Sequence, residues 1–225
     1  MPVGAILFSE MTPAPEWEGA FHTWYDTHHI PIRMAAPGFL GAGRYQRMDG
    51  PGFLAVYDMA DEGTLQTPEY AVIKGQPSAE TAWMLENVSG FTRHIGSLIG
   101  QQTRPEVSEA EMLASPFLYA VLFDVPADRQ ADFDAWYDQD HVPLLLGCKD
   151  WLGCRRYSLN VSHPEHFTHI ALHHLADMSA LESPARAAAR ASDWRARIAA
   201  EPWFKGTYMT FAARGDRFAP TGDKA

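Results

Sequence analysis

The stretch WYDTHHIP, from Trp24 to Pro31, returns later in the chain as WYDQDHVP, from Trp136 to Pro143. The two tryptophans set a shift of 112 residues, and many other residues repeat with the same shift. These further pairs are Phe21 and Phe133, Tyr25 and Tyr137, Asp26 and Asp138, His29 and His141, Arg44 and Arg156, and Tyr45 and Tyr157. Chance does not produce so many matches in one register, so we interpret the chain as a tandem repeat.

Each copy shows the same succession of hydrophobic patterns. Apolar runs bounded by polar or glycine residues predict strands, and apolar residues at helical spacing predict helices. The expected strands are 3–9, 41–48, 53–59 and 92–100 in the first copy, and 117–125, 153–160, 167–174 and 207–214 in the second. The expected helices are 15–29 and 67–87, and then 128–140 and 183–200.

The order βαββαβ, written twice, is the ferredoxin-like pattern. It predicts a four-stranded antiparallel sheet with both helices on one face, which leaves the other face apolar and in need of cover. We therefore predict an α+β fold in which the antiparallel sheets of two ferredoxin-like repeats pack into one intramolecular dimeric α/β barrel. The predicted domains are 1–102 and 116–225, joined by a polar linker at 103–115.

The composition limits the partners and the compartment. The chain has 225 residues, 46% of them hydrophobic and 20% charged, as in soluble globular proteins. A net charge of -10 argues against nucleic-acid binding, and no apolar run is long enough to span a membrane. The first residues lack the features of a signal peptide, and two cysteines cannot build a disulfide scaffold. We expect a cytoplasmic protein.

The arginines at 186, 190, 195 and 197 are interpreted as a solvated helix face.

The repeated phrase has a structural and a chemical interpretation. On a regular helix Trp24, Tyr25 and His28 face the sheet, and His29 lies at the edge of that face. Pro31 predicts that the helix ends at the preceding residue, where the helix dipole favours a protonated imidazole. A histidine there suits proton transfer near neutral pH. The structural alternative is core packing by the Trp-Tyr pair and a histidine that caps the helix.

The pattern F-x-x-W-Y-x-x-x-H-x-P, followed by P-G-F-L-x-x-x-R-Y, resembles the EthD-like branch of the dimeric α/β-barrel superfamily. The first copy carries it at Phe21, Trp24, Tyr25, His29, Pro31, Pro37, Gly38, Phe39, Leu40, Arg44 and Tyr45. The second copy repeats it but has Lys149-Asp150 in place of Pro-Gly. Members of the superfamily pair two chains, so this chain resembles a fused pair. They include cofactor-independent monooxygenases, polyketide cyclases, lactone isomerases and haem enzymes, so the resemblance implies the fold rather than the reaction.

The leading hypothesis is a cofactor-independent enzyme that uses histidine acid–base chemistry on a small aromatic, lactone or polyketide-derived compound, as an isomerase, cyclase or lyase. The candidate catalytic residues are His29, Tyr25, Asp26 and His141. The candidate substrate-binding residues are Trp24, His28, Arg44, Tyr45, Tyr57, Trp136, Tyr137 and Arg156. We place the main pocket in the first copy, which keeps more of the motif, and two inequivalent pockets remain an option. No dinucleotide or phosphate loop is visible, and no cofactor is expected.

Several alternatives remain open. The nearest is a cofactor-free monooxygenase. Another is a haem-binding barrel, in which His29, His94 or His169 would be the axial ligand. A third is a ligand-binding barrel without catalysis. A metal site of His169, His173 and Asp140 is disfavoured, because positions i and i+4 on a strand lie about 13 Å apart. The expected assembly is a monomeric pseudo-dimer or a homodimer of it.

A further alternative concerns the amino terminus. Pro2 opens the first expected strand, as in tautomerases that use an amino-terminal proline. The second copy has no such terminus, so this alternative ranks last.

Overall fold

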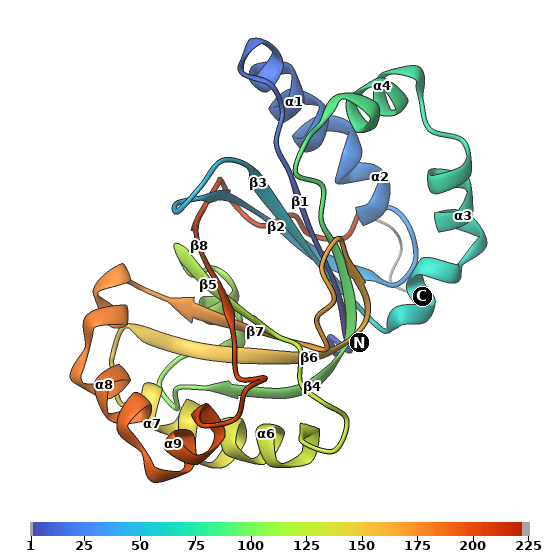
Figure 1. Ribbon diagram of the computed structural model, residues 1–225. Coiled ribbons are helices and arrows are strands. Elements are labelled where there is room, and N and C mark those ends of the chain that lie inside the picture. Colours follow the sequence, from blue (N-terminus) through green and yellow to red (C-terminus); the bar gives the residue numbers. More distant parts are fainter. Residues whose placement is uncertain (1, 222–225) are drawn as a thin grey trace. The chain divides into compact units, whose positions relative to one another are not determined.

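The computed structural model describes residues 2–221, which form two compact units (Figure 1). The first unit holds the residues up to Ser97, Asn160–Pro164 and the residues from Arg214 onward. The second unit holds Leu98–Leu159 and Glu165–Ala213. Each unit therefore consists mainly of one sequence repeat, with short segments of chain exchanged between them.

The sheet of the first unit has the strand order β4-β1-β3-β2, and all of its pairs are antiparallel. Its strands are β1 (Ala5–Met11), β2 (Phe39–Arg47), β3 (Phe53–Met59) and β4 (Arg93–Thr103), the last of which enters the second unit after Ser97. Leu7 lies opposite both Tyr57 and Ile95, and Ala42 lies opposite Tyr57. These four side chains point to the same sheet face, which the helices cover.

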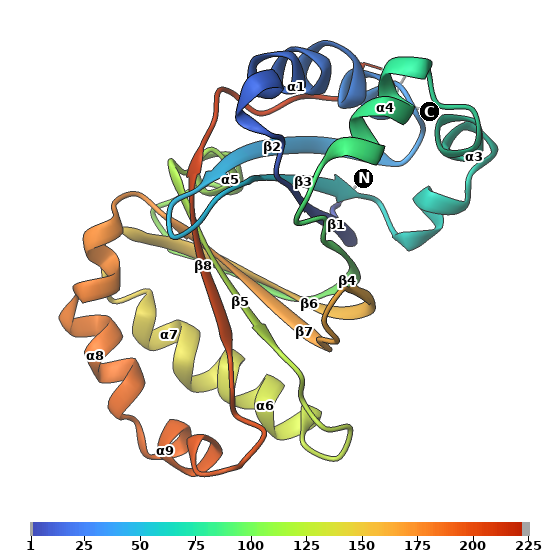
Figure 2. The same ribbon diagram turned by 45° about the horizontal axis from the view of Figure 1, so that its top comes forward.

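The helices of this unit lie on one face of its sheet (Figure 2). They are α1 (Glu18–Trp24), α2 (Pro31–Met34), α3 (Pro68–Gly75) and α4 (Ala79–Asn87), with 3₁₀ turns at Pro15–Trp17 and Glu62–Gln66. The single helix predicted at 67–87 is wrong, because α3 and α4 are separate. Pro77 cannot continue the hydrogen-bond ladder, and Ser78 caps α4 by accepting a bond from the Thr81 amide.

The second unit repeats this architecture with the strand order β8-β5-β7-β6. Its strands are β5 (Phe117–Phe123), β6 (Trp151–His163), β7 (His169–Leu175) and β8 (Thr207–Ala213). Its helices are α6 (Gln130–Trp136), α7 (Val142–Leu145), α8 (Pro184–Ala191) and α9 (Asp193–Ala199), with a 3₁₀ turn at Met178–Glu182. The helix predicted at 183–200 is again divided, because Ser192 caps α9. A short helix, α5 (Glu109–Leu113), forms within the predicted linker and begins with a capping box of Ser108 and Glu111.

The end of the first helix in each unit is a π-helical turn, η2 (Tyr25–His29) in the first and η4 (Tyr137–His141) in the second. The Ile30 amide donates to the Tyr25 carbonyl at 3.0 Å, five residues earlier. The wider turn continues directly into α2, so the prediction that the helix ends before Pro31 is wrong. Pro31 instead opens the next helical segment, where its missing N–H is harmless.

Both units therefore have the ferredoxin-like order of elements, and the predicted α+β fold with two such halves is confirmed. No helix formed by residues 2–221 is both long and apolar enough to cross a membrane.

Candidate active site

The first unit contains a cavity of about 510 Å³ between its sheet and its helices. The π-turn contributes Tyr25 and His29, β3 contributes Tyr57, and α2 contributes Arg33. The other lining residues are Leu7, Ser9, Met11, His28, Ile32, Tyr70, Val72, Ile73, Lys74, Gln76, Pro77, Ser78, Thr81, Leu85, Phe91 and Arg93. The walls are mainly apolar, with a few polar groups that converge on the space, as in a small-molecule site.

The π-turn decides which histidine is buried. An α-helical turn would place His28 toward the sheet, but the extra residue in the turn rotates His28 outward and His29 inward. His29 is 3% exposed, whereas His28 is half-buried. The predicted placement of His28 toward the sheet is therefore wrong, because His29 takes that position and His28 lies half-buried at the wall of the cavity. Such π-turns occur frequently at functional sites.

The His29 imidazole is held against two aromatic rings. Its centroid lies 4.3 Å from that of Trp24 and 4.8 Å from that of Tyr25. Trp24 is itself fixed, because its Nε1 donates to Thr81 Oγ1 at 3.1 Å. Trp24 is not among the cavity-lining residues, so it supports His29 from behind. His29 Nδ1 is buried and has no hydrogen-bond partner within residues 2–221.

Burial keeps His29 neutral. Desolvation lowers the pKa of His29 well below 6.5, and the charges of Arg33, His28 and Arg44 lower it further. The expectation that the helix dipole favours a protonated imidazole is therefore wrong, because burial outweighs the dipole. A neutral imidazole at pH 7 can accept a proton from a bound compound.

Two phenols lie beside this histidine in their protonated form. Burial raises the pKa of Tyr25 above 10 and that of Tyr57 well above it. The two hydroxyls lie close together, but Tyr57 Oη makes no hydrogen bond of good geometry to the described chain. Its hydroxyl proton therefore has no well-placed acceptor among the described residues.

Tyr70 on α3 has a different environment from the other two phenols. Burial raises its pKa, but the hydrogen bond from Arg93 and the charges of Arg93 and Arg33 outweigh burial, and its pKa lies below 10. Arg93 Nη2 donates to Tyr70 Oη at 3.3 Å. The Arg33 guanidinium lies 5.6 Å from the Tyr57 ring centroid and donates to the His29 carbonyl at 2.7 Å. The cavity thus combines one neutral base with phenol donors and positive charge.

Two predicted site residues of the first copy form a separate cluster. Arg44 donates to Asp26 Oδ1 at 2.7 Å and to His22 Nδ1 at 3.0 Å, and its side chain is 1% exposed. Neither Arg44 nor Asp26 lines the cavity. Tyr45 follows Arg44 on β2 and so points to the opposite sheet face, and it does not line the cavity either. The structure brings Tyr25, His28, His29 and Tyr57 together and leaves these three residues outside.

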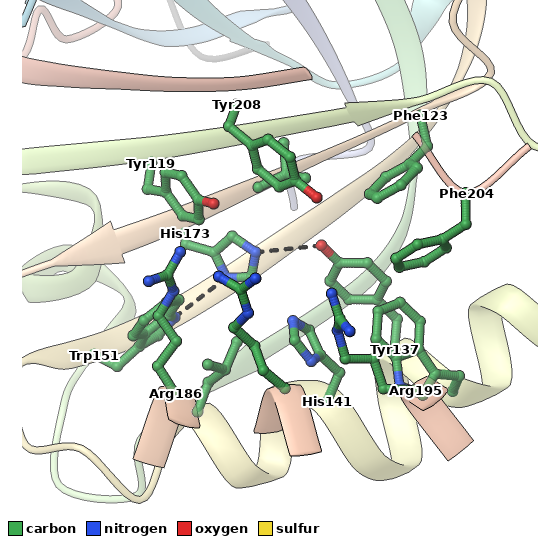
Figure 3. A pocket seen from close by; sticks show the side chains of 14 residues that line it. Tyr119, Phe123, Tyr137, His141, Trp151, His173, Arg186, Arg195, Phe204 and Tyr208 are labelled. Carbon is green, nitrogen blue, oxygen red and sulfur yellow. Dashed lines mark hydrogen bonds between the residues drawn. The ribbon is translucent and has the colours of Figure 1, made fainter. Parts of the chain in front are cut away.

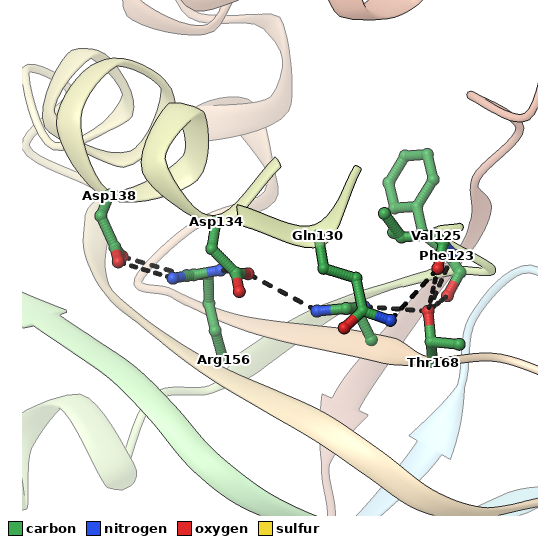
Figure 4. Close-up of polar contacts among 8 residues, drawn as sticks. Phe123, Val125, Gln130, Asp134, Asp138, Arg156 and Thr168 are labelled. Carbon is green, nitrogen blue, oxygen red and sulfur yellow. Dashed lines mark hydrogen bonds and ion pairs between the residues drawn. The ribbon is translucent and has the colours of Figure 1, made fainter. Parts of the chain in front are cut away.

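The second unit repeats this cluster around Arg156 (Figure 4). Its guanidinium donates to Asp134 Oδ1 at 2.7 Å and to Asp138 Oδ2 at 2.6 Å, and it lies 5.2 Å from the Tyr137 ring centroid. Asp134 also lies 3.6 Å from His169. Arg156 is occupied by these carboxylates and does not line the larger cavity of its unit.

That larger cavity has a volume of about 360 Å³ (Figure 3). Three predicted residues, Trp136, Tyr137 and His141, line it. The other lining residues are Tyr119, Val121, Phe123, Leu145, Trp151, His173, Arg186, Arg190, Arg195, Phe204 and Tyr208. Burial lowers the pKa of His141 to about 4 and that of His173 well below 6.5, so both rings are neutral at pH 7.

His173 was not among the predicted site residues, although it belonged to the disfavoured metal site of His169, His173 and Asp140. Trp151 Nε1 donates to His173 Nδ1 at 3.2 Å, which leaves the ring proton on Nε2, 3.4 Å from Tyr137 Oη. This pairing holds the Tyr137 hydroxyl at the cavity wall, as Figure 3 shows. Sequence spacing could not reveal it, because 36 residues separate the partners.

The arginines of α8 and α9 were interpreted as a solvated face, and this is wrong for two of them. Arg186 and Arg195 are half-buried and line the cavity, and Arg190 lines it from an exposed position. Arg197 is exposed and lies outside it. The four-residue spacing of Arg186 and Arg190 in an alanine-rich helix was the available signal.

The alternative histidine ligands are less suitably placed than His29. His94 Nδ1 pairs with Ser162 at 2.9 Å, and His169 pairs with Asp134, and neither lines the two cavities. In the described part of the chain no three His, Cys, Asp or Glu side chains are grouped as a metal site would require. His29 is the candidate axial ligand that a bound compound could reach.

No family model matches the sequence, and no curated protein matches it either. Solved structures do. An anthrone oxidase-like protein is 15% identical with a TM-score of 0.71, over 100% of this chain and 96% of that one. A protein from Fusobacterium nucleatum subsp. nucleatum, named only provisionally as a monooxygenase, is 9% identical with a TM-score of 0.63, over 98% and 96% of the two chains. A chlorite dismutase from Candidatus Nitrospira defluvii is 9% identical with a TM-score of 0.60, over 94% and 91%.

At these identities the likeness concerns the fold. It supports a mixed α+β architecture with two ferredoxin-like halves. The reaction has to be argued from the site.

Proposed function

We propose that the chain is an enzyme of the EthD-like branch and that the cavity of its first unit is the active site. There His29 removes a proton from a small aromatic compound next to a carbonyl group. The observation that carries the proposal is the neutral, buried His29, whose Nδ1 has no partner in the described chain and which shares a cavity with Tyr57 and Arg33. Without a ligand this buried nitrogen makes no hydrogen bond, which is unfavourable whichever ring nitrogen carries the proton.

The other groups support the charge that proton removal creates. As the proton moves to His29, negative charge develops on the substrate's carbonyl oxygen. The hydroxyls of Tyr57 and Tyr25 can donate to that oxygen, and the Arg33 guanidinium supplies positive charge in an apolar cavity, where such interactions are strongest. Ile32, Ile73, Leu85 and Phe91 would hold the rings of the compound.

Protonation of the resulting anion at another atom gives an isomer. Attack of the anion on a second carbonyl group of the same compound closes a ring, and expulsion of a leaving group from the neighbouring carbon cleaves a bond. None of these steps needs an oxidant. We favour this class because a base, phenol donors and a cation are the groups that the site contains. His29 can return the proton, so the residue is unchanged after each turnover.

A second outcome is cofactor-free oxygenation, and the names of the anthrone oxidase-like and monooxygenase neighbours favour it. In that case the carbanion forms a bond to O2 and is protonated to a hydroperoxide. The O–O bond then breaks as the second proton leaves the same carbon, which becomes a carbonyl group and releases water. O2 is the oxidant, and each anthrone-type CH2 group consumes one molecule.

Anthrone is the probe that separates these steps. Without O2 in D2O, the enzyme should speed exchange of the C10 protons, and this exchange needs only the base. His29→Ala should lower the exchange rate by about 10²–10⁴-fold. With O2, uptake and the absorbance of anthraquinone report oxygenation.

His141→Ala is the matched comparison, because it changes the equivalent histidine of the other unit. It should leave the exchange rate within about twofold if the first unit is the active one. A full loss in His141→Ala with normal exchange in His29→Ala would assign the chemistry to the second unit. Equal rates for the wild type and both variants would refute the proposal.

A further inference from the structure

The two cavities are built from equivalent positions that carry different chemistry. Thr67 caps α3 by accepting from the Tyr70 amide, and Ser183 caps α8 by accepting from the Arg186 amide. Tyr70 and Arg186 are therefore the same position of the same helix. One turn further on, Lys74 corresponds to Arg190.

The last pair of helices gives a third correspondence. Ser78 caps α4 through the Thr81 amide, and Ser192 caps α9 through the Arg195 amide. Thr81 and Arg195 are thus equivalent, and both line a cavity. Tyrosine, lysine and threonine in the first unit are three arginines in the second.

These three guanidinium groups have no counter-ion among residues 2–221. No carboxylate lies within ion-pair distance of Arg186, Arg190 or Arg195, and the lining of the cavity contains no Asp or Glu. Figure 3 shows Arg186 and Arg195 extending from their helices toward Tyr119 and Tyr137. Burial, together with the charges of Arg190 and Arg186, lowers the pKa of Arg195 from its usual value. Three like charges therefore lie close together without a carboxylate to balance them, although Arg186 also donates to the Leu181 carbonyl at 2.5 Å.

The rest of the cavity is aromatic. Trp136, Trp151, Phe204 and the rings of Tyr119 and Tyr208 line it, and the last two stack with centroids 6.2 Å apart and planes at 11°. A volume of about 360 Å³ suits one or two fused rings. Flat faces favour planar ligands, and the cationic groups favour an anion.

We infer that the cavity of the second unit is a binding site for a small planar aromatic carboxylate, whose carboxylate group is held by Arg186, Arg190 and Arg195. Guanidinium groups bind a carboxylate through two parallel N–H bonds, which lysine cannot reproduce. This site lies apart from the reaction proposed for the first unit and does not depend on it.

Isothermal titration of the intact protein with 2-naphthoate at low ionic strength tests the inference. The wild type should bind one naphthoate at this site, and 2-naphthalenemethanol, which has the same rings without charge, should bind at least tenfold more weakly. Arg195→Thr installs the side chain that the first unit has at this position, and it should weaken naphthoate binding at least tenfold. Arg190→Gln should do the same, and it changes an exposed residue that the fold does not need.

Arg129→Gln is the control, because it removes an arginine of the same unit that is half exposed and lies outside the cavity. It should leave the affinity within twofold. Unchanged affinity in Arg190→Gln and Arg195→Thr would overturn the inference, and so would equal binding of the uncharged analogue. Tighter binding of 2-naphthyl phosphate than of naphthoate would overturn the assignment of a carboxylate. An equal loss in Arg129→Gln would reduce the effect to overall charge and would overturn the site.

Discussion

The guanidinium of Arg44 lies over the ring of Tyr25, with its carbon 4.4 Å from the ring centroid. The same group bonds to Asp26, the next residue of the π-turn. Arg156 repeats both contacts with Tyr137 and Asp138. Each π-turn is thereby attached to the neighbouring strand, which fixes the orientation of the histidine four residues after the tyrosine.

Arg44→Gln should therefore destabilise the first unit. The substitution removes a charge-assisted bond to Asp26 and a bond to buried His22, and the free energy of unfolding should fall by about 2–3 kcal/mol. Urea denaturation followed by circular dichroism measures this. Arg129→Gln removes a half-exposed arginine that pairs with Asp128 and Glu201 at 3.5 Å or more, and should cost less than about 1 kcal/mol. Equal losses would show that the cluster has no special role.

Tyr57→Phe should lower kcat with little effect on KM, because the lost hydroxyl donates to charge that forms only in the transition state. The expected loss is about 10²-fold in kcat, typical of one oxyanion donor. Steady-state kinetics on the probe measure it. Tyr157→Phe removes a buried phenol outside both cavities and is the matched control. A raised KM with normal kcat would assign Tyr57 to binding alone.

His141 should make stability depend on pH. Burial lowers its pKa to about 4, so between pH 6.5 and 4 the unfolded chain takes up a proton that the folded chain does not. Stability therefore falls as the pH falls through this window, by about 3 kcal/mol for this one residue. The difference in free energy of unfolding between wild type and His141→Gln should shrink by that amount between pH 7 and pH 4. His166→Gln, which changes an exposed histidine, should show no such trend.

The order of elements followed from the repeated phrase and from hydrophobic periodicity, because both are local properties of the chain. The breaks at Pro77 and Ser192 were missed, although a proline and a capping serine were visible, because each pair of helices shares one apolar pattern. The π-turn could not be predicted. A wheel of about 100° per residue assumes a regular helix, and that assumption turned His28 inward in place of His29.

The residues of the cavities were predicted in part. Tyr25, His28, His29 and Tyr57 meet in the first cavity, and Trp136, Tyr137 and His141 meet in the second. Arg44 and Arg156 were candidates because arginines bind anions. Arg156 is in fact bound by two aspartates that lie one helical turn apart on α6 and η4. These aspartates become its partners only when the helix packs on the strand. The three arginines of the second cavity were missed as site residues, because a sequence does not distinguish an arginine that lines a cavity from one on an exposed helix face.

The matching caps of α3 and α8 bear on how such a protein can change. In a homodimer of identical chains, symmetry places every substitution in both pockets at once, so a mutation that favours one ligand alters both sites. A single chain with two separately encoded halves is free of that constraint. Tyr70 and Arg186 illustrate this freedom, because the same position carries a phenol in one half and a cation in the other. One half can keep its chemistry while the other acquires a new ligand. A few substitutions of residues that line the cavity are enough for this, and the packed core stays unchanged.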